Sequence, residues 1–195
     1  MTIKIRPAHP SDASDMAVLV DIAGHGLAAF FWGRSRSETD PDSVLEVGRS
    51  RALRDEGSFS WRNAFMAELD DRVAGMLTGY RQPDKMDDDD LDELDPLIRP
   101  LVELESMAPS TWYVNVLATH AEFRGQGIGS ALMTKAEDLA RAEGTSGLSV
   151  IVEDSNTGAR RLYERHGYTL EAERPYVPFG ERSHSKFWQL LVRQF

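Results

Sequence analysis

Three closely spaced glycines late in the chain are the feature that most constrains its fold. They lie in the segment Phe123-Arg124-Gly125-Gln126-Gly127-Ile128-Gly129-Ser130, between an apolar strand-like run and a helix-like run. Glycine reaches φ > 0 and lets a ligand approach the backbone, and the start of a helix leaves N–H groups unpaired. The turn therefore predicts an anion-binding cradle.

The flanking segments indicate a strand, a turn, a helix and a second strand. Residues 112–119 are rich in β-branched and aromatic side chains, as in a buried strand. After the glycines, apolar residues recur at helical spacing and Gly144 is a plausible stop signal. Residues 148–152 are typical of another buried strand. The apolar helix positions are Ile128, Leu132, Ala136 and Leu139.

Two nucleotide-binding patterns fit the glycines poorly. A dinucleotide fingerprint needs glycine at the last position of G-x-G-x-x-G, where this chain has Ser130. A P-loop needs a lysine directly after its glycines, and this chain has none there. An ordinary glycine turn without a ligand remains an alternative.

Two motifs together resemble one known family. Arg124-x-x-Gly127-x-Gly129 resembles the acyl-CoA signature of the GCN5-related N-acetyltransferases (GNAT superfamily), and residues 156–168 resemble that family's N-x-x-A-x-x-L-Y-x-x-x-G-F/Y block. The resemblance is specific over residues 112–168 and general elsewhere. It implies a coenzyme A pyrophosphate held by the amides of the glycine loop, after a bulged central strand.

The resemblance implies an α/β fold of three layers: a mixed, mostly antiparallel sheet with a splayed central strand, flanked by helices. Residues 2–6 resemble the opening strand, and Ser11-Asp12-Ala13 the cap of the first helix. Alternation over residues 65–69 and 73–80 predicts a hairpin that turns at Asp70-Asp71, and residues 188–192 predict the closing strand. We expect one acetyltransferase domain over residues 1–195.

An acidic insertion is expected at about residues 82–110. Its run Asp87-Asp88-Asp89-Asp90 is either a solvated loop or a negatively charged surface that attracts a cationic amine substrate. After it, apolar residues from Leu94 to Leu104 predict a short amphipathic helix, although Pro96 and Pro100 interrupt the pattern.

Composition narrows the function classes. The net charge of −10 argues against nucleic acid as a partner, because phosphate binding needs a basic face. No apolar run is long enough for a membrane span and no signal peptide is evident, so we expect a cytoplasmic protein. The absence of cysteine excludes an acyl-cysteine intermediate and favours direct transfer. The five histidines are scattered, so no metal site is expected.

The resemblance assigns roles to individual residues. Backbone N–H groups of the central strand would stabilise the charge on the thioester oxygen, and the glycine loop would bind the cofactor. Tyr163 would face the sulfur and protonate the leaving thiolate, although it also belongs to a helical stripe with Ala159, Leu162 and His166 that is typical of a core. The implied coenzyme-binding residues are Leu117, Ala118, Thr119, Arg124, Gly125, Gln126, Gly127, Ile128, Gly129, Ser130, Asn156 and Tyr163.

Asn156 also has two interpretations. It would orient the pantetheine arm while Ser155 or Asp154 caps the helix, or it is itself part of the cap. Arg124 is the arginine that matches the main motif, and we expect Arg160 and Arg161 to face solvent.

The general base is left open. The presumed strand residues Tyr113, Asn115, Leu117 and Thr119 include no acid, and neither does the segment 148–152. The remaining candidates are a water chain, a weakly basic substrate amine, and four side chains: Glu68, Glu103, Glu105 and His120.

The leading hypothesis is an N-acetyltransferase that moves an acetyl group from acetyl-CoA directly to an amine of a small molecule or a protein. Alternatives are another acyl group or acceptor, a CoA-binding regulatory module with little turnover, and an interaction domain whose glycines serve folding. Residues 24–33 lie where members of the family place the two helices that flank the acceptor pocket. The aromatic residues Phe30, Phe31 and Trp32 would either pack the core or form a wall of that pocket. Tyr176, Phe179 and Trp188 would pack the last hairpin, form a homodimer interface or close the acceptor site.

Overall fold

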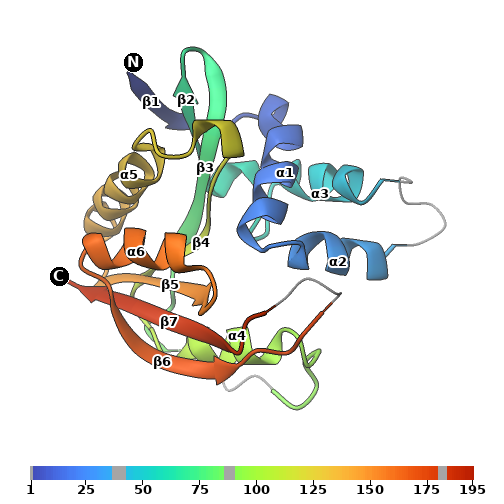
Figure 1. Cartoon of the computed structure of the whole chain (residues 1–195), viewed down its shortest axis with the longest axis vertical. Helices are drawn as coiled ribbons and strands as arrows, with labels where there is room; N and C mark the ends of the chain where they lie inside the picture. Colours follow the sequence, from blue (N-terminus) through green and yellow to red (C-terminus); the bar gives the residue numbers. More distant parts are fainter. Residues whose placement is uncertain (1, 37–42, 86–90, 180–183) are drawn as a thin grey trace. The chain divides into compact units, whose positions relative to one another are not determined.

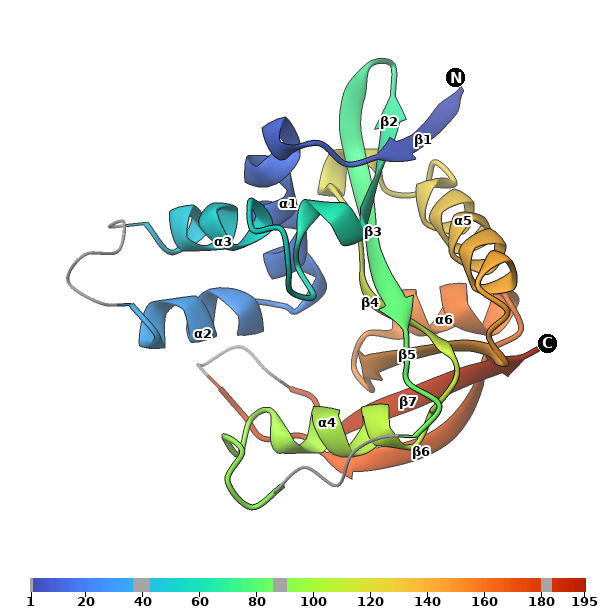
Figure 2. The ribbon, with the colours of Figure 1, turned by 180° about the vertical axis from the view of Figure 1, so that it is seen from behind.

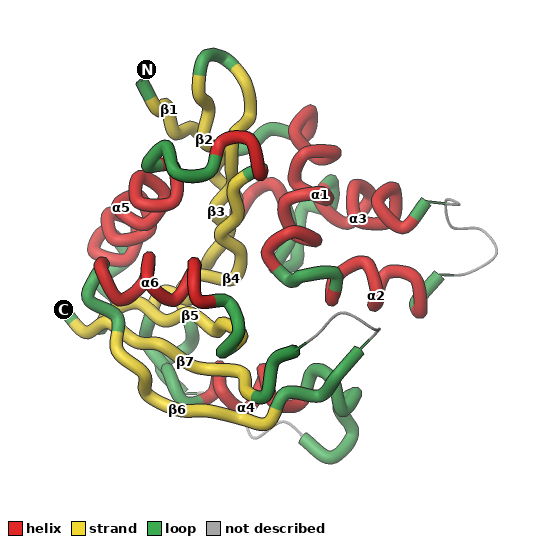
Figure 3. Tube along the Cα trace, viewed as in Figure 1, coloured by secondary structure: helices red, strands yellow, loops and turns green. Residues whose placement is uncertain are grey.

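The computed structural model describes residues 2–36, 43–85, 91–179 and 184–195. The chain forms two compact units, one of residues 1–79 and 115–135 and the other of residues 80–114 and 136–195. Seven strands form one sheet in the order β1-β2-β3-β4-β5-β7-β6 (Figures 1 and 3). The strands are β1 (Ile3–Pro7), β2 (Ala64–Leu69), β3 (Arg72–Arg81), β4 (Trp112–Thr119), β5 (Gly147–Glu153), β6 (Thr169–Pro175) and β7 (Phe187–Gln194).

The sheet is mixed and mostly antiparallel, as expected. β4 and β5 run parallel, whereas β1–β2, β2–β3, β5–β7 and β6–β7 are antiparallel. The helices are α1 (Ala13–Ala23), α2 (Leu27–Arg34), α3 (Val44–Ala52), α4 (Arg99–Ser106), α5 (Ile128–Ala142) and α6 (Thr157–Arg165), with short 3-10 turns η1 (Pro10–Asp12), η2 (Trp61–Asn63) and η3 (Ala121–Phe123).

The predicted hairpin is confirmed in the first unit. β2 and β3 are joined by Asp70 and Asp71, which have φ values of 50° and 59°. Two successive left-handed residues are the geometry of a type I′ turn, whose twist matches that of the strands. Aspartate tolerates this conformation because its short side chain can hydrogen-bond locally.

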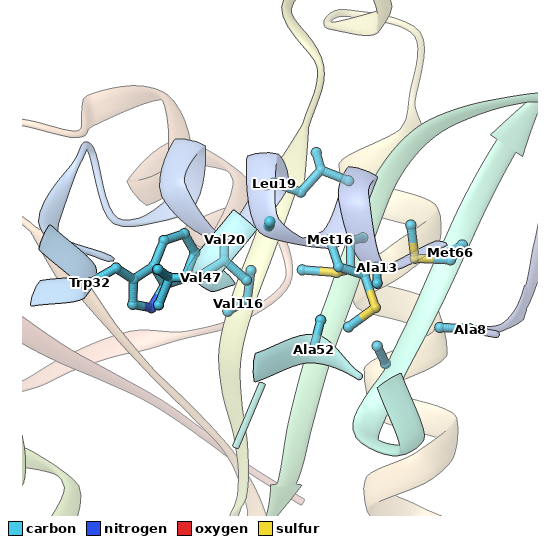
Figure 4. Close-up of a cluster of buried hydrophobic side chains, with 14 residues drawn as sticks. Ala8, Ala13, Met16, Leu19, Val20, Trp32, Val47, Ala52, Met66 and Val116 are labelled. Atoms are coloured by element: carbon cyan, nitrogen blue, oxygen red, sulfur yellow. The ribbon is translucent and has the colours of Figure 1, made fainter. Parts of the chain in front are cut away.

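Three helices build the core of the first unit against its strands (Figures 2 and 4). α1 packs against α2 and α3, and α2 against α3. Trp32 of α2 is 2% exposed and lies over Gly48 of α3, where an added Cβ would be 2.4 Å from the indole ring. Trp32 therefore serves core packing, one of the two roles expected for the aromatic residues of 24–33.

The first helix begins where expected, with Asp12 as its N-cap residue, but the Asp12 carboxylate makes no capping bond to that helix. Instead it accepts hydrogen bonds from the Arg6 guanidinium at 2.8 and 2.9 Å and from the His9 N–H at 2.7 Å. Arg6 also binds Glu68 at 2.6 Å, so β1, β2 and the start of α1 share one ion-pair network.

The pair β3–β4 contains the bulge that the resemblance implies. The His120 N–H donates to the Ala74 carbonyl at 3.0 Å, and the Gln82 N–H to the Thr111 carbonyl at 2.8 Å. From Ala74 to Gln82 there are eight positions, but from Thr111 to His120 there are nine. Because antiparallel bonds join opposite residues, the β4 side carries one extra residue between them.

The second unit corrects two predicted boundaries. The helix expected from Leu94 begins only at Arg99, with Pro100 in its first turn, where a missing N–H costs nothing. The strand expected over residues 148–152 extends to Glu153, and the closing strand predicted over 188–192 is β7. β6, which the sequence analysis did not identify, pairs with β7. The aspartate run 87–90 lies outside the described residues.

Among the described helices, none alone has the length and apolarity to cross a membrane, although the bent pair Pro10–Ala23 and Leu27–Arg34 passes that test together.

We predict opposite effects for two helix glycines of the first unit. Gly48→Ala should destabilise the protein by about 1–3 kcal/mol, because the methyl group would overlap the buried Trp32 ring. Gly33→Ala is the matched control: it is exposed in α2, its Cβ would meet only Val44 at 3.6 Å, and it should be neutral or stabilising by up to about 1 kcal/mol. Urea unfolding of both variants measures the difference. Equal midpoints would contradict the packing described here.

Candidate acyl-CoA site

The glycine loop has the backbone geometry of an anion cradle. Gly125 and Gly127 have φ values of 76° and 85°, a region that other residues enter at a cost. A Cβ at Gly125 would meet no atom within 4 Å. The loop backbone is therefore exposed and open on the side where a ligand would approach.

Unpaired N–H groups follow the loop. The first backbone hydrogen bond of α5 runs from the Ala131 N–H to the Gly127 carbonyl at 3.0 Å. The N–H groups of Ile128, Gly129 and Ser130 precede that bond and have no carbonyl acceptor among the described residues. These three donors, with the positive end of the helix dipole, suit a phosphate oxygen.

Arg124 connects the loop to the end of β4. Its Nε donates to the Thr119 carbonyl at 3.4 Å, while the side chain stays exposed. The nearby Glu122 faces Arg72 at 3.5 Å, so a cation offsets the charge of this carboxylate. The loop therefore carries an exposed cation, Arg124, four residues before the start of α5.

Gly75 of β3 is a supporting residue that the sequence analysis missed. An added Cβ would lie 2.6 Å from the Ala118 carbonyl oxygen and 3.1 Å from Ile128. The lack of a side chain thus lets β3, β4 and the first residue of α5 come close together. A glycine inside a strand was the available signal for such a close approach. All of these residues, with Leu117, belong to the first unit.

The remaining two coenzyme-binding candidates, Asn156 and Tyr163, belong to the second unit. Asn156 caps α6 itself, since its Oδ1 accepts from the Ala159 N–H at 3.2 Å. Of the two interpretations, the one in which Asn156 is part of the cap is therefore confirmed. The one in which Asp154 or Ser155 caps the helix is wrong, because Asp154 accepts from the Lys186 N–H and Ser155 bonds to Ser185.

Tyr163 occupies the inward face of α6. It is 5% exposed, and its ring packs against that of Tyr168 with the centroids 5.7 Å apart. Burial raises the pKa of Tyr163, so the phenol stays protonated at neutral pH. This is the state that a proton donor needs, and the packing role weighed in the sequence analysis is present as well.

The two additional arginines of α6 differ. Arg160 is held by Glu164 at 2.9 Å and also by Gln189, whereas Arg161 is exposed as expected. Tyr176 packs on Trp188 at 4.9 Å and near Phe179 at 6.1 Å, which supports the hairpin-packing alternative for these aromatics.

The candidate bases lie in different electrostatic environments. Arg6 and Lys4 lower the pKa of Glu68, and Arg99 and Arg174 lower the pKa of Glu103. Burial instead raises the pKa of Glu105. His120 lies beyond the end of β4 and is half-buried.

A further carboxylate, Glu153, was missed because the predicted strand ended one residue too early. It lies at the end of β5, is 6% exposed, and accepts from the Ser185 hydroxyl at 2.7 Å. Among the described residues, no group of three or more His, Cys, Asp or Glu side chains is arranged to hold a metal ion.

Comparison with known proteins decides the family. The model of the Acetyltransferase (GNAT) family matches residues 25–168, most of the chain and the whole of both motifs. The chain belongs to the GNAT acetyltransferase family. It is therefore an acyl-CoA-dependent transferase by family, and the resemblance seen in the sequence is confirmed.

Individual relatives are distant. Over 60 residues the chain is 38% identical to a mycothiol acetyltransferase of Beutenbergia cavernae, a match that spans 31% of this chain and 20% of that protein. A Drosophila melanogaster polyamine N-acetyltransferase shares the fold with a TM-score of 0.69, 15% identity and full coverage of both chains.

A GNAT acetyltransferase from Elizabethkingia anophelis, solved with acetyl-CoA bound, has a TM-score of 0.50 and 16% identity over 68% of this chain and 75% of that one. These structural matches support the fold of this GNAT chain.

Proposed function

We propose that this GNAT chain transfers an acetyl group from acetyl-CoA directly to an amine. The observation that carries the proposal is the cradle at the start of α5. It combines three N–H groups that have no carbonyl acceptor among the described residues, two glycines at positive φ, and the exposed Arg124. This donor set fits a pyrophosphate, because it offers N–H groups and a cation to an anion on an open face.

The names of similar proteins support the donor and the acceptor class. The Elizabethkingia structure contains acetyl-CoA, and the Drosophila protein is a polyamine N-acetyltransferase. An amine acceptor also agrees with the net charge of −10, which attracts cations. The chain has no cysteine, so transfer through an acyl-cysteine is excluded within it.

Cofactor binding, stabilisation of the thioester oxygen and proton donation would fall to different residues. The glycine loop and Arg124 would hold the pyrophosphate, and the backbone of Leu117, Ala118 and Thr119 would donate to the thioester oxygen as it gains negative charge. Tyr163, protonated and buried, would give its proton to the departing thiolate and then regain one.

The cradle can be tested by comparing CoA with pantetheine, which lacks the pyrophosphate. CoA at about a hundredfold its dissociation constant should add about 2.7 kcal/mol to stability, visible as a rise in Tm. Arg124→Ala should weaken binding of CoA but leave acetyl-pantetheine turnover unchanged, because the truncated donor does not reach the loop. Arg161→Ala, an exposed arginine on α6, is the control. A chain that CoA does not stabilise would refute the proposal.

The acceptor is found by following thiol release from acetyl-CoA across a panel of primary amines. We expect release that depends on the added amine. CoA binding without any amine-dependent release would instead identify a regulatory module and contradict the proposed turnover.

We predict that removing the Tyr163 hydroxyl lowers kcat by more than any loss of folded protein would explain. Tyr163→Phe keeps the ring against Tyr168 but removes the proton, and kcat should fall by about 100-fold or more. Tyr168→Phe is the matched control: its buried hydroxyl has no hydrogen-bond partner among the described residues, so its removal should leave kcat unchanged and not lower stability. Near-normal kcat in Tyr163→Phe would rule out the donor role.

A further inference from the structure

A polar cluster in the second unit joins α4 to the strands β3 and β4. Glu105, in the last turn of α4, is half-buried, and its Oε2 accepts from Nε2 of Gln82 at 3.5 Å. The phenol of Tyr113 on β4 lies within hydrogen-bonding reach of the same carboxyl group. The ring of Tyr80 stands edge-on to Tyr113 with the centroids 5.7 Å apart.

Glu105 differs from its neighbour on the same helix. Glu103 binds Arg99 at 2.9 Å and Arg174 at 2.6 Å, so its charge is neutralised by two cations. The groups found to act on the Glu105 carboxyl, within the described chain, are the amide of Gln82 and the phenol of Tyr113. Glu105 is thus a half-buried carboxyl group that forms no ion pair within the described residues and is held by neutral hydrogen-bond donors.

Three further strands of the second unit, β5, β6 and β7, pack against α4. Their arginines are already engaged, because Arg174 of β6 binds Glu103 and Arg193 of β7 binds Glu137. Their carboxylates are engaged too: Glu173 accepts from Gln189 and Glu153 from Ser185, while Glu171 is exposed.

Tyr113 links this carboxyl group to the proposed proton donor. Burial, Glu105, Tyr80 and Tyr163 together raise the pKa of Tyr113. Tyr113 is therefore coupled electrostatically to a candidate base, Glu105, and to the proposed proton donor, Tyr163.

We propose that Glu105 accepts the proton of the acceptor ammonium and that Tyr113 is the positioning residue that orients its carboxylate. The proposal rests on the proposed function, since it names the base of that same site.

The Glu105 carboxylate takes one proton from R–NH₃⁺, and the nitrogen lone pair forms the N–C bond to the thioester carbonyl. The C–S bond then breaks with its electron pair on sulfur. The second nitrogen proton replaces the one that Tyr163 gives to the thiolate, and Glu105 releases its proton to water. The products are the amide, free CoA and one proton.

The test compares Glu105→Gln with Glu103→Gln, a change at the neighbouring carboxyl group of α4. The probes are a primary alkylamine that the wild-type chain acetylates and its β,β-difluoro analogue, whose ammonium is far more acidic. With the alkylamine, Glu105→Gln should lower kcat/KM by about 100- to 10,000-fold at pH 7, whereas Glu103→Gln should not. The loss should shrink to less than about tenfold with the difluoro amine, which needs no base.

The pH profile separates a base from a merely structural residue. Wild-type kcat/KM should fall at acid pH as Glu105 is protonated, with an inflection above that of an ordinary glutamate because burial raises its pKa. Glu105→Gln should lose this inflection. Tyr113→Phe should move it to higher pH, because the phenol's hydrogen bond lowers the pKa of Glu105.

The outcomes distinguish the two proposals. If the wild-type chain releases no thiol with any amine, the proposed function fails. If it releases thiol and Glu105→Gln keeps both the rate and the acid inflection, the role of Glu105 is overturned while the function stands. CoA binding and Tm report whether each variant is folded. If Glu105→Gln does not fold, the acid inflection in the kcat/KM profile of Tyr113→Phe is the deciding measurement. An inflection at the wild-type pH would then count against the proposal.

Discussion

The acyl-CoA site depends on the close approach of β3 and β4 at Gly75. A single methyl group there would lie 2.6 Å from the Ala118 carbonyl and 3.1 Å from Ile128. Gly75 therefore allows both β4, which precedes the glycine loop, and Ile128, the first residue of α5, to pack closely against β3. Since the proposed oxyanion donors and the phosphate donors are backbone groups, their positions are set by main-chain packing rather than by side-chain choice.

The features predicted correctly are those that local chemistry determines. Gly125 and Gly127 adopt positive φ because their segment must turn from strand to helix, and Asp70 and Asp71 turn the hairpin for a similar reason. Gly144, also at positive φ, follows the end of α5 as a stop signal should. Each of these can be found in a window of a few residues.

Where the structure departs from expectation, a partner in another part of the chain decides the outcome. The carboxylate of Asp12 could cap α1, but Arg6 on β1 and the His9 N–H bind it instead. β5 extends through Glu153 because β7 continues beside it, with Trp188 opposite that residue. Composition near residue 153 could not reveal this pairing, since the partner lies 35 positions away.

The choice among the candidate bases has the same origin. In the sequence, Glu68, Glu103 and Glu105 are three equivalent glutamates, and two of them lie on one short helix. In the structure, Arg6 lowers the pKa of Glu68, and Arg99 of the same helix together with Arg174 of β6 lowers the pKa of Glu103. Burial instead raises the pKa of Glu105. The spacing of Arg99 and Glu103 can be read from the sequence, but the contact with Arg174 of β6 and the burial of Glu105 depend on tertiary structure.

A raised pKa matters because of the size of the proton-transfer problem. An alkylammonium with a pKa of about 10.4 costs about 4–5 kcal/mol to deprotonate at neutral pH. A carboxylate held by two arginines, like Glu103, is a weaker base than glutamate in water and makes the direct transfer from ammonium to carboxylate more uphill. Every pKa unit by which burial raises Glu105 lowers that uphill step by about 1.4 kcal/mol, provided the group stays ionised at the working pH. The hydrogen bonds from Gln82 and Tyr113 act in the opposite direction and limit the rise, so the cluster balances base strength against the fraction of carboxylate present.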